Sequence, residues 1–292
     1  MHKVVIIGSG QVGQTLGRLL NQFNKYKVIG VWDRNINNAR AGARFIGRGA
    51  RICSDKTVAV QQADIVFITT PDSVIQQVCD SIFTGRNAFS NKIVLHCSGS
   101  LPSAILKSAQ RHKRVYIASI HPIQTFADKA ETVSNFKGTY CVYEGQRQAL
   151  AIVRNIISTL GGKPIEIKAR DKTLYHIGCV FASNYLVTLM RTAQEFLSGC
   201  GFKDKDVLRA IQPLVASTVR NIMTIGPVSA LTGPIARGDA LIIKDHIRAI
   251  RKVQPLYMAL YRELGKHTVG MARQKGTISA FQASLLRKAM SI

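Results

Sequence analysis

The sequence lacks long apolar runs, paired cysteines and an ordinary share of acidic residues. No stretch approaches the roughly 20 apolar residues that a membrane-spanning helix needs, so we expect no membrane segment. The first apolar run, Val4–Ile7, ends in a glycine loop rather than a cleavage site, which argues against a secretory signal. The six cysteines are scattered without a Cys-x-x-Cys pair, which predicts reduced thiols in a cytoplasmic protein and no metal site.

Acidic residues are scarce: 16 Asp and Glu stand against 40 Lys and Arg, a net charge of +24 in 292 residues. The positive charge is spread over both halves of the chain, whereas a nucleic-acid-binding arm would concentrate it. The even spread fits a proteome-wide bias or a general attraction for anionic ligands, and we do not expect a nucleic-acid-binding function. The 46% hydrophobic content predicts a sizeable core and excludes a mainly disordered chain.

The pattern of the chain changes near residue 165. Before it, short β-branched runs alternate with amphipathic stretches, which predicts a doubly wound, Rossmann-type parallel sheet. After it, helical periodicity dominates, including an expected continuous helix over Lys172–Ser198 and another over Ala240–Leu264. We expect a dinucleotide-binding domain over 1–165 and an all-helical domain for substrate binding and dimerisation over 166–292. The expected strands are Lys3–Ile7, Lys27–Trp32, Ala50–Cys53, Asp64–Thr69, Lys92–His96, Arg114–Ser119, Gly138–Tyr143 and Lys163–Ile167.

A G-x-G-x-x-G motif follows the first expected strand and opens the first expected helix, which is the context that dinucleotide binding requires. Gly8 permits the tight turn, Gly10 lets a pyrophosphate approach the backbone, and Gly13 lets the helix pack on the strand. The helix N-terminus offers N–H groups to the phosphates. The predicted cofactor loop is Gly8, Ser9, Gly10, Gln11, Val12 and Gly13.

The residues that end the second strand give opposing indications about the cofactor. Asp33 is placed to accept hydrogen bonds from the ribose hydroxyls and to repel a 2′-phosphate, which favours NAD. Arg34 is placed to pair with that 2′-phosphate, which favours NADP. These residues alone leave the choice open.

Three loops should meet at the carboxyl edge of the sheet, where doubly wound folds bind their ligands. They follow the fourth, fifth and sixth strands, and ordinary turn chemistry is the alternative explanation for their composition. Cofactor contacts are expected from the first two loops and substrate contacts from the last two. The residues concerned are Thr69, Thr70, Pro71, Ser98, Gly99, His121 and Gln124.

Two places in the helical half carry further candidates. On a continuous helix His176, Ser183 and Asn184 would share a face, so His176 could donate a proton while Asn184 holds a carbonyl or carboxylate. The alternative is a buried His–Asn pair that only fixes helix packing. Arg237, between helices, is a candidate contact for an anionic substrate, or simply part of a helix break capped by Asp239.

Taken together, these motifs resemble the NADP oxidoreductases that join a Rossmann-like domain to domain of unknown function 2520. Their layout is similar to pyrroline-5-carboxylate reductases, ketopantoate reductases and β-hydroxyacid dehydrogenases, with a helical domain of the 6-phosphogluconate dehydrogenase type. The motifs that carry the resemblance are Gly8-x-Gly10-x-x-Gly13, His96-x-Ser98-Gly99, His121-Pro122-x-Gln124-x-Phe126, Tyr175-His176, Ala182-Ser183-Asn184-Tyr185 and Thr232-Gly233-Pro234-x-x-Arg237-Gly238-Asp239.

The resemblance implies a nicotinamide-dependent reductase, with NADP favoured over NAD, acting on a small anionic carbonyl or imine acid. It also implies a homodimer through the helical domain. The β-hydroxyacid dehydrogenases carry a catalytic lysine one turn before an asparagine on the long helix, but here Val180 stands one turn before Asn184. We therefore expect His176, Asn184 and His121 as the catalytic candidates. A non-catalytic NAD(P) sensor is the alternative.

Overall fold

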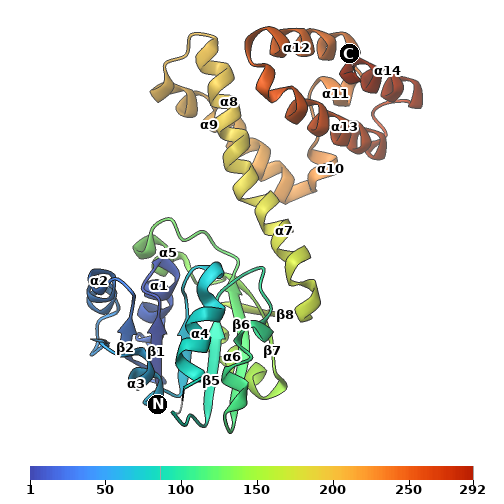
Figure 1. Cartoon of the computed structure of the whole chain (residues 1–292). Helices are drawn as coiled ribbons and strands as arrows, with labels where there is room; N and C mark the ends of the chain where they lie inside the picture. Colours follow the sequence, from blue (N-terminus) through green and yellow to red (C-terminus); the bar gives the residue numbers. More distant parts are fainter. Residues whose placement is uncertain (86, 292) are drawn as a thin grey trace. The chain divides into compact units, whose positions relative to one another are not determined.

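The computed structural model describes residues 1–85 and 87–291, which form two compact units, Met1–Ala182 and Ser183–Ile292 (Figure 1). The sequence placed the domain boundary at 165/166. The first unit also includes α7 (Lys172–Ala182), because Lys172 is buried there and hydrogen-bonded to the loop and strand beneath it.

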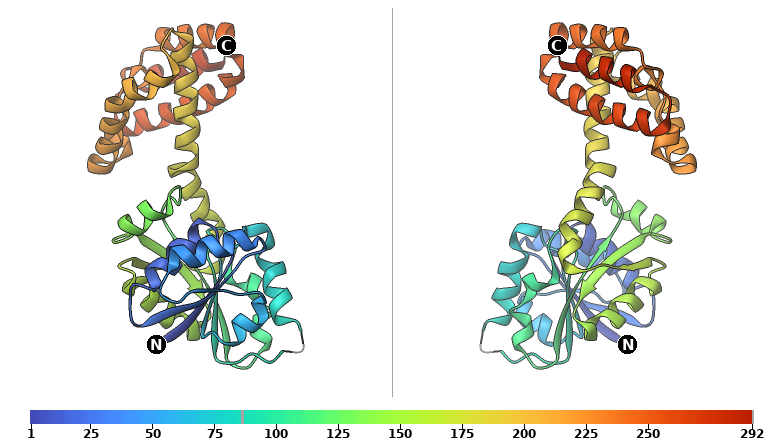
Figure 2. Two further views of the ribbon diagram at one scale, coloured as in Figure 1. Left: turned by 90° about the vertical axis from the view of Figure 1, so that its left-hand side faces the viewer. Right: turned by 90° about the vertical axis from the view of Figure 1, so that its right-hand side faces the viewer.

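The first unit is built on a mainly parallel sheet, so the expected Rossmann-type fold class is confirmed (Figures 1 and 2). The described residues form eight strands in the order β3-β2-β1-β4-β5-β6-β7-β8. The sequence did not reveal that β7 runs antiparallel to β6, starting beside the carboxyl end of β6 with Pro122 opposite Cys141. The strands are β1 (His2–Ile7), β2 (Tyr26–Trp32), β3 (Arg51–Ile52), β4 (Ile65–Ile68), β5 (Lys92–His96), β6 (Val115–Pro122), β7 (Tyr140–Gly145) and β8 (Lys163–Glu166).

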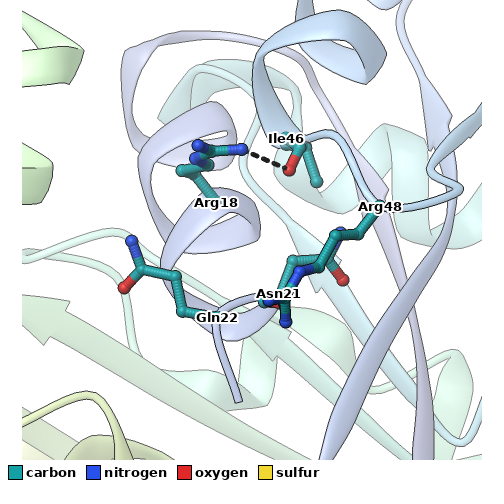
Figure 3. Close-up of a pocket in the computed structure, with 5 residues that line it drawn as sticks. All are labelled: Arg18, Asn21, Gln22, Ile46 and Arg48. Atoms are coloured by element: carbon teal, nitrogen blue, oxygen red, sulfur yellow. Dashed lines mark hydrogen bonds between the residues drawn. The ribbon is translucent and has the colours of Figure 1, made fainter. Parts of the chain in front are cut away.

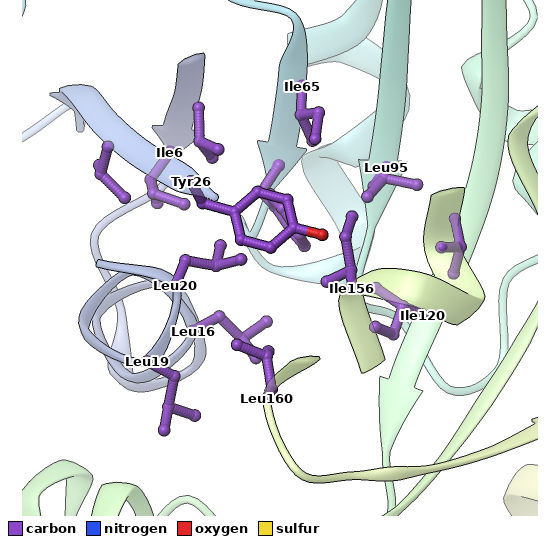
Figure 4. Packing of buried hydrophobic residues seen from close by; sticks show 14 of the residues in the cluster. Ile6, Leu16, Leu19, Leu20, Tyr26, Ile65, Leu95, Ile120, Ile156 and Leu160 are labelled. Atoms are coloured by element: carbon purple, nitrogen blue, oxygen red, sulfur yellow. The ribbon is translucent and has the colours of Figure 1, made fainter. Parts of the chain in front are cut away.

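Helices cover both faces of the sheet because successive residues of its central strands are apolar on both sides. In β1, Val4 and Ile6 face one core, whereas Val5 and Ile7 face the other. Figure 4 shows the first core, in which the Tyr26 ring lies among aliphatic side chains from the sheet and from α1 and α6. The helices are α1 (Gln11–Leu20), α2 (Ile36–Ile46), α3 (Lys56–Gln61), α4 (Ile75–Phe83), α5 (Lys129–Asn135) and α6 (Arg147–Thr159), with 3₁₀ turns η1 (Asp72–Val74), η2 (Ser103–Leu106), η3 (Ala109–Arg111) and η4 (Ala169–Asp171).

The strand register brings the predicted loops to one edge of the sheet. Ile7 pairs with Ile68, Ile68 with His96, and His96 with Ser119, so the four positions form one row across neighbouring parallel strands. The loops after β1, β4 and β5 therefore leave the sheet side by side. His121 lies two residues beyond Ser119, and so above the row on the same face of β6.

The second unit is helical, with a small core where α12, α13 and α14 meet. Two expected helices are interrupted. The one predicted over Lys172–Ser198 ends at Ala182, since Ser183 has non-helical torsion angles, and the one over Ala240–Leu264 is broken at Pro255. The helices are α8 (Asn184–Gly199), α9 (Asp204–Ile225), α10 (Pro227–Ala230), α11 (Pro234–Arg237), α12 (Ala240–Val253), α13 (Met258–Lys275) and α14 (Ala280–Ser291), with the 3₁₀ turn η5 (Pro255–Tyr257).

Among the residues that the structure describes, no helix has both the length and the apolar character needed to cross a bilayer.

Candidate functional site

The three glycines of the loop after β1 have different surroundings. Gly8 has φ +102°, and a Cβ built on it would lie 2.7 Å from the main-chain nitrogen of Thr70. A Cβ on Gly13 would lie 2.4 Å from the carbonyl oxygen of Gly8 and from the Thr69 hydroxyl. Within the described part of the chain, a Cβ on Gly10 would meet nothing within 4 Å. Gly8 and Gly13 are therefore required for packing, while Gly10 leaves the approach to the loop open.

The start of α1 is suited to an anionic group. Gly10 occupies the N-cap position, the first turn holds no acidic residue, and among the described residues no side chain caps it. Its N–H groups and the positive end of the helix dipole are thus available to a phosphate. The Thr70 hydroxyl, beside Gly8, is buried and makes no hydrogen bond to any described residue. Both observations fit a bound dinucleotide.

Asp33 is hydrogen-bonded to the glycine loop. Its Oδ2 accepts a hydrogen bond from the main-chain nitrogen of Ser9 at 2.7 Å, and its Oδ1 accepts one from that of Asn35 at 2.9 Å. A carboxylate oxygen can accept more than one hydrogen bond, so the predicted contact with ribose stays a prediction. Arg34, next to Asp33, is exposed.

The Ser98 hydroxyl organises the turn after β5. It donates to Oδ2 of Asp72 at 2.6 Å and accepts from the main-chain nitrogens of Ser100 and Leu101 at 3.2 and 3.0 Å. The His96 ring is fully buried, and its Nδ1 accepts from the Ser98 nitrogen at 3.1 Å. Because the single hydroxyl proton of Ser98 is already donated, the hydroxyl shapes the turn, and the predicted ligand contacts of Ser98 stay predictions.

Two histidines and a tyrosine gather over this turn. Nδ1 of His121 lies 2.5 Å from the hydroxyl of Tyr175, and the rings of His121 and His176 are 6.0 Å apart, edge to face. A Cβ built on Gly99 would lie 2.5 Å from Cδ2 of His176 and 2.9 Å from Nε2 of His121. Gly99 therefore allows both imidazoles to approach the main chain closely. Both histidines were predicted as site residues from the sequence, whereas Tyr175 was not.

The surroundings of this cluster disfavour extra positive charge. Burial, together with the charges of Lys172 and His176, lowers the pKa of His121 to about 4. Burial, together with Lys172, lowers the pKa of His96 to about 3. Burial raises the pKa of Tyr175 well above its ordinary value. At neutral pH, His96 and His121 are thus uncharged and Tyr175 keeps its proton.

Lys172, which the sequence analysis missed, lies beneath the cluster in the first turn of α7. Its side chain is 1% exposed, and Nζ donates to the Ser98 carbonyl at 2.7 Å and to the Ser119 hydroxyl at 2.8 Å. A lysine beginning a helix is unfavourable beside the positive end of the helix dipole, which is the signal that could have identified it.

The remaining predicted residues are less well connected to the cluster. The side chain of Gln124 accepts from the neighbouring Thr125 nitrogen at 3.0 Å. Pro71 is exposed and precedes η1. Ser183, Asn184 and Arg237 belong to the second unit, where Arg237 forms a 2.9 Å ion pair with Asp239. The interruption at Ser183 removes the continuous helix on which the shared face of His176 and Asn184 was predicted.

A separate hollow of about 280 Å³ lies at the other end of α1 (Figure 3). Arg18 and Arg48 line it, and each guanidinium donates to a main-chain carbonyl near a helix end, of Ile46 and Asn21 respectively. These contacts stabilise helix C-termini, and the hollow is remote from the glycine loop. Among residues 1–85 and 87–291, no group of His, Cys, Asp or Glu side chains could hold a metal ion.

Solved structures share the fold of this chain over nearly their whole length. A candidate NADP oxidoreductase from Bacteroides fragilis is 22% identical, with a TM-score of 0.74 over 92% of this chain and 98% of that one. Protein TM1727 from Thermotoga maritima is 25% identical, with a TM-score of 0.65 over 99% and 98%. A reductive aminase from Aspergillus terreus, in complex with NADPH and ethyl-5-oxohexanoate, is 14% identical, with a TM-score of 0.62 over 100% and 93%.

Family models match the two parts of the chain separately, and no curated protein matches its sequence. Residues 3–100 match the family described as NADP oxidoreductase coenzyme F420-dependent. Residues 139–268 match the domain of unknown function DUF2520. The expected resemblance is confirmed: the chain matches an NADP oxidoreductase model in its first part and the DUF2520 model in its second.

Proposed function

We propose that the protein is an NADPH-dependent reductase of a small, anionic carbonyl or imine compound. The observation that carries this proposal is the common sheet edge. The Gly10 opening follows β1, and the cluster lies over the turn after β5, with His121 near the end of β6; β1, β4, β5 and β6 pair in parallel, so these ends share one edge. A dinucleotide bound at the loop after β1 extends along such an edge in doubly wound folds.

The glycine loop and its surroundings support the cofactor assignment. The uncapped start of α1 would receive the pyrophosphate, and the unpartnered Thr70 hydroxyl would meet a polar group of the cofactor. The match of residues 3–100 to an NADP oxidoreductase family, together with the exposed Arg34, favours NADP over NAD. Asp33, which accepts from the main-chain nitrogens of Ser9 and Asn35, keeps its negative charge and acts against this choice.

The cofactor, when bound, supplies the hydride, and the protein supplies placement and a proton. We assign the proton donor to His176, with His121 as the second candidate. His121 is neutral at pH 7, so it suits hydrogen bonding to the substrate better than donation of a full proton. Tyr175 would hold the His121 ring in place through its hydroxyl. Substrate contacts by Gly99, Gln124, Ser183, Asn184 and Arg237 stay predictions from the sequence.

The second unit supports the proposed homodimer. Among the described residues, α8 has no buried side chain and α9 has Val207 alone, although α9 spans 22 residues. Leu214 and Met223 of α9 are 69% and 81% exposed. Burying one such side chain stabilises an interface by roughly 1.5–3 kcal/mol. This favours a dimer in which a second copy of the chain covers these side chains of α9. Light scattering should show a dimer, and Leu214→Lys with Met223→Lys should give monomers.

Turnover tests the proposed function. Purified protein is mixed with NADPH and a panel of oxo acids, with and without ammonia or small amines, and NADPH oxidation is followed by absorbance. We expect oxidation with at least one substrate, and its loss in His176→Gln. A protein that binds NADPH tightly, yet oxidises it with no member of the panel, would be a nucleotide sensor instead.

A further inference from the structure

The first turn of α7 holds a buried charge that the proposed chemistry does not use. Lys172 is 1% exposed, and it begins a helix whose dipole disfavours a cation. A buried ammonium is costly unless it is paired and hydrogen-bonded. Its position therefore requires a specific set of partners.

Those partners form a chain that ends at a buried carboxylate. Nζ of Lys172 donates to the Ser119 hydroxyl at 2.8 Å, and that hydroxyl donates to Oε1 of Glu144 at 2.6 Å. Glu144, 4% exposed, also accepts from the nitrogen of Ser103 at 2.6 Å and from its hydroxyl at 2.8 Å. The positive and negative groups are thus linked by one hydroxyl across β6 and β7.

The same ammonium holds the turn beneath the two imidazoles. Its second hydrogen bond goes to the Ser98 carbonyl at 2.7 Å, directly before Gly99. The His96 ring holds the Ser98 nitrogen, and Asp72 holds the Ser98 hydroxyl. Tyr175, in the same turn of α7 as Lys172, holds the ring of His121. The first turn of α7 therefore fixes the Ser98–Gly99 turn through Lys172 and the His121 ring through Tyr175.

We propose that Lys172 is a positioning residue for the reaction: tied through Ser119 to Glu144, its ammonium fixes the Ser98–Gly99 turn against His121 and His176. This inference rests on the proposed function. Lys172 touches neither the reacting atoms nor the cofactor in this account, and it acts through the turn and through its charge.

The charge of Lys172 also bears on the histidines nearby. Burial lowers the pKa of Lys172 to about 8, while Glu144, Cys97 and Asp72 act in the opposite direction. Below that pH the ammonium disfavours protonation of both His96 and His121, whose pKa values it lowers. The charge of Asp72 raises the pKa of both rings, whereas that of His176 lowers the pKa of His121. Burial is the larger cause of the low pKa of His121, and the charge of Lys172 adds to it.

The experiment compares Lys172→Met with a matched variant of a second buried lysine. Lys92, 6% exposed, begins β5 at the opposite end of the strand from His96, and its Nζ donates to the Gln61 and Ala63 carbonyls. Lys92→Met removes an equally buried amine without touching the turn. The readouts are the titration of the His121 ring by NMR and hydrogen exchange of the Ser100 and Leu101 amides, neither of which needs a substrate.

In Lys172→Met, the His121 midpoint should rise by roughly half a pH unit or more, because a nearby positive charge is removed. Exchange of the two amides should accelerate about tenfold or more as the turn loosens. Lys172→Gln, which keeps N–H donors without the charge, should restore slow exchange but not the midpoint. It also replaces Lys172→Met if the latter does not fold. In Lys92→Met, both readouts should match the unmodified protein.

Unchanged titration and exchange in Lys172→Met and Lys172→Gln, with only a lower melting temperature as in Lys92→Met, would overturn the proposal. With a substrate from the turnover panel, Lys172→Met should lower kcat about tenfold or more with little change in the Kd for NADPH. An empty panel with the titration shift present would contradict the proposed reductase while leaving the link between Lys172 and His121 in place.

Discussion

The hydrogen bond between Nδ1 of His121 and the hydroxyl of Tyr175, at 2.5 Å, joins the end of β6 to the first turn of α7. Burial raises the pKa of Tyr175 and lowers that of His121, so both groups are uncharged at neutral pH. We infer that the phenol donates to Nδ1, which leaves the imidazole proton on Nε2. Nε2 is the nitrogen beside Gly99, so His121 presents a donor on the side where the turn leaves room.

Gly10→Val should abolish cofactor binding without unfolding the protein. A side chain there meets no described atom of the chain within 4 Å but fills the approach to the start of α1. At a concentration of 100 Kd, NADPH should stabilise the unmodified protein by about 2.7 kcal/mol, measured by thermal melting, and the variant by nothing. Gly13→Ala provides the contrast, because its clash with Gly8 should lower the melting temperature before any ligand is added. A full NADPH shift in Gly10→Val would show that the cofactor does not bind there.

Arg34→Ala should weaken NADPH more than NADH, by roughly 1–3 kcal/mol, through loss of a charge-assisted contact with the 2′-phosphate. Calorimetric titration of both cofactors measures the difference. Arg40→Ala is a suitable comparison, because its guanidinium already donates to Asn37 at 2.9 Å. Equal losses for the two cofactors in Arg34→Ala would show that Arg34 has no role in selecting NADP.

His176→Gln should lower kcat and kcat/KM together by roughly 10²–10⁴ if His176 is the general acid. Tyr175→Phe should have a smaller effect, since it removes the hydrogen bond that orients His121 but leaves both imidazoles in place. Steady-state kinetics on the substrate found by the turnover panel separates the two. Full activity in His176→Gln with a lower melting temperature would assign His176 to packing and direct attention to His121.

The stability of the fold should fall as the pH drops from about 6.5 towards 4. The pKa of His121 is lowered to about 4 and that of His96 to about 3, so the unfolded chain binds protons first. The stability contributed by these neutral rings is complete above pH 6.5 and is lost on acidification, on the order of a few kcal/mol. Urea unfolding across this range should give a steep slope, and His96→Gln should flatten it. If the slope of stability against pH is unaltered in His96→Gln, other groups control the loss of stability at acidic pH.

The β-strands, the glycine loop and the shared sheet edge could be predicted from the sequence. They depend on the local alternation of apolar residues and on turn residues that are close together in the chain. Lys172 escaped notice because its importance depends on partners far away in the sequence, Ser98 and Ser119. Likewise, the ligand contacts of Asp33 and Ser98 stay predictions, whereas their hydrogen bonds to other loops, at Ser9 and Asp72, were not foreseen because these partners are distant in the sequence. Residue type alone cannot distinguish these two uses of a polar side chain.

The helical half was predicted less accurately, because helix breaks depend on single residues. Ser183 interrupts an apolar pattern that continues on both sides, so periodicity alone gave one helix in place of α7 and α8. The break separates His176, in the first unit, from Asn184, in the second. The prediction that they share a face was thus based on a helix that does not continue.

A crystal structure of the protein with NADPH bound would decide whether the proposed site is the right one. We expect the pyrophosphate at the start of α1 and the nicotinamide beside the Gly99 turn, with His121 or His176 within hydrogen-bond reach of a group placed next to its C4. A nicotinamide bound away from this turn, with neither imidazole close to C4, would refute the proposed site.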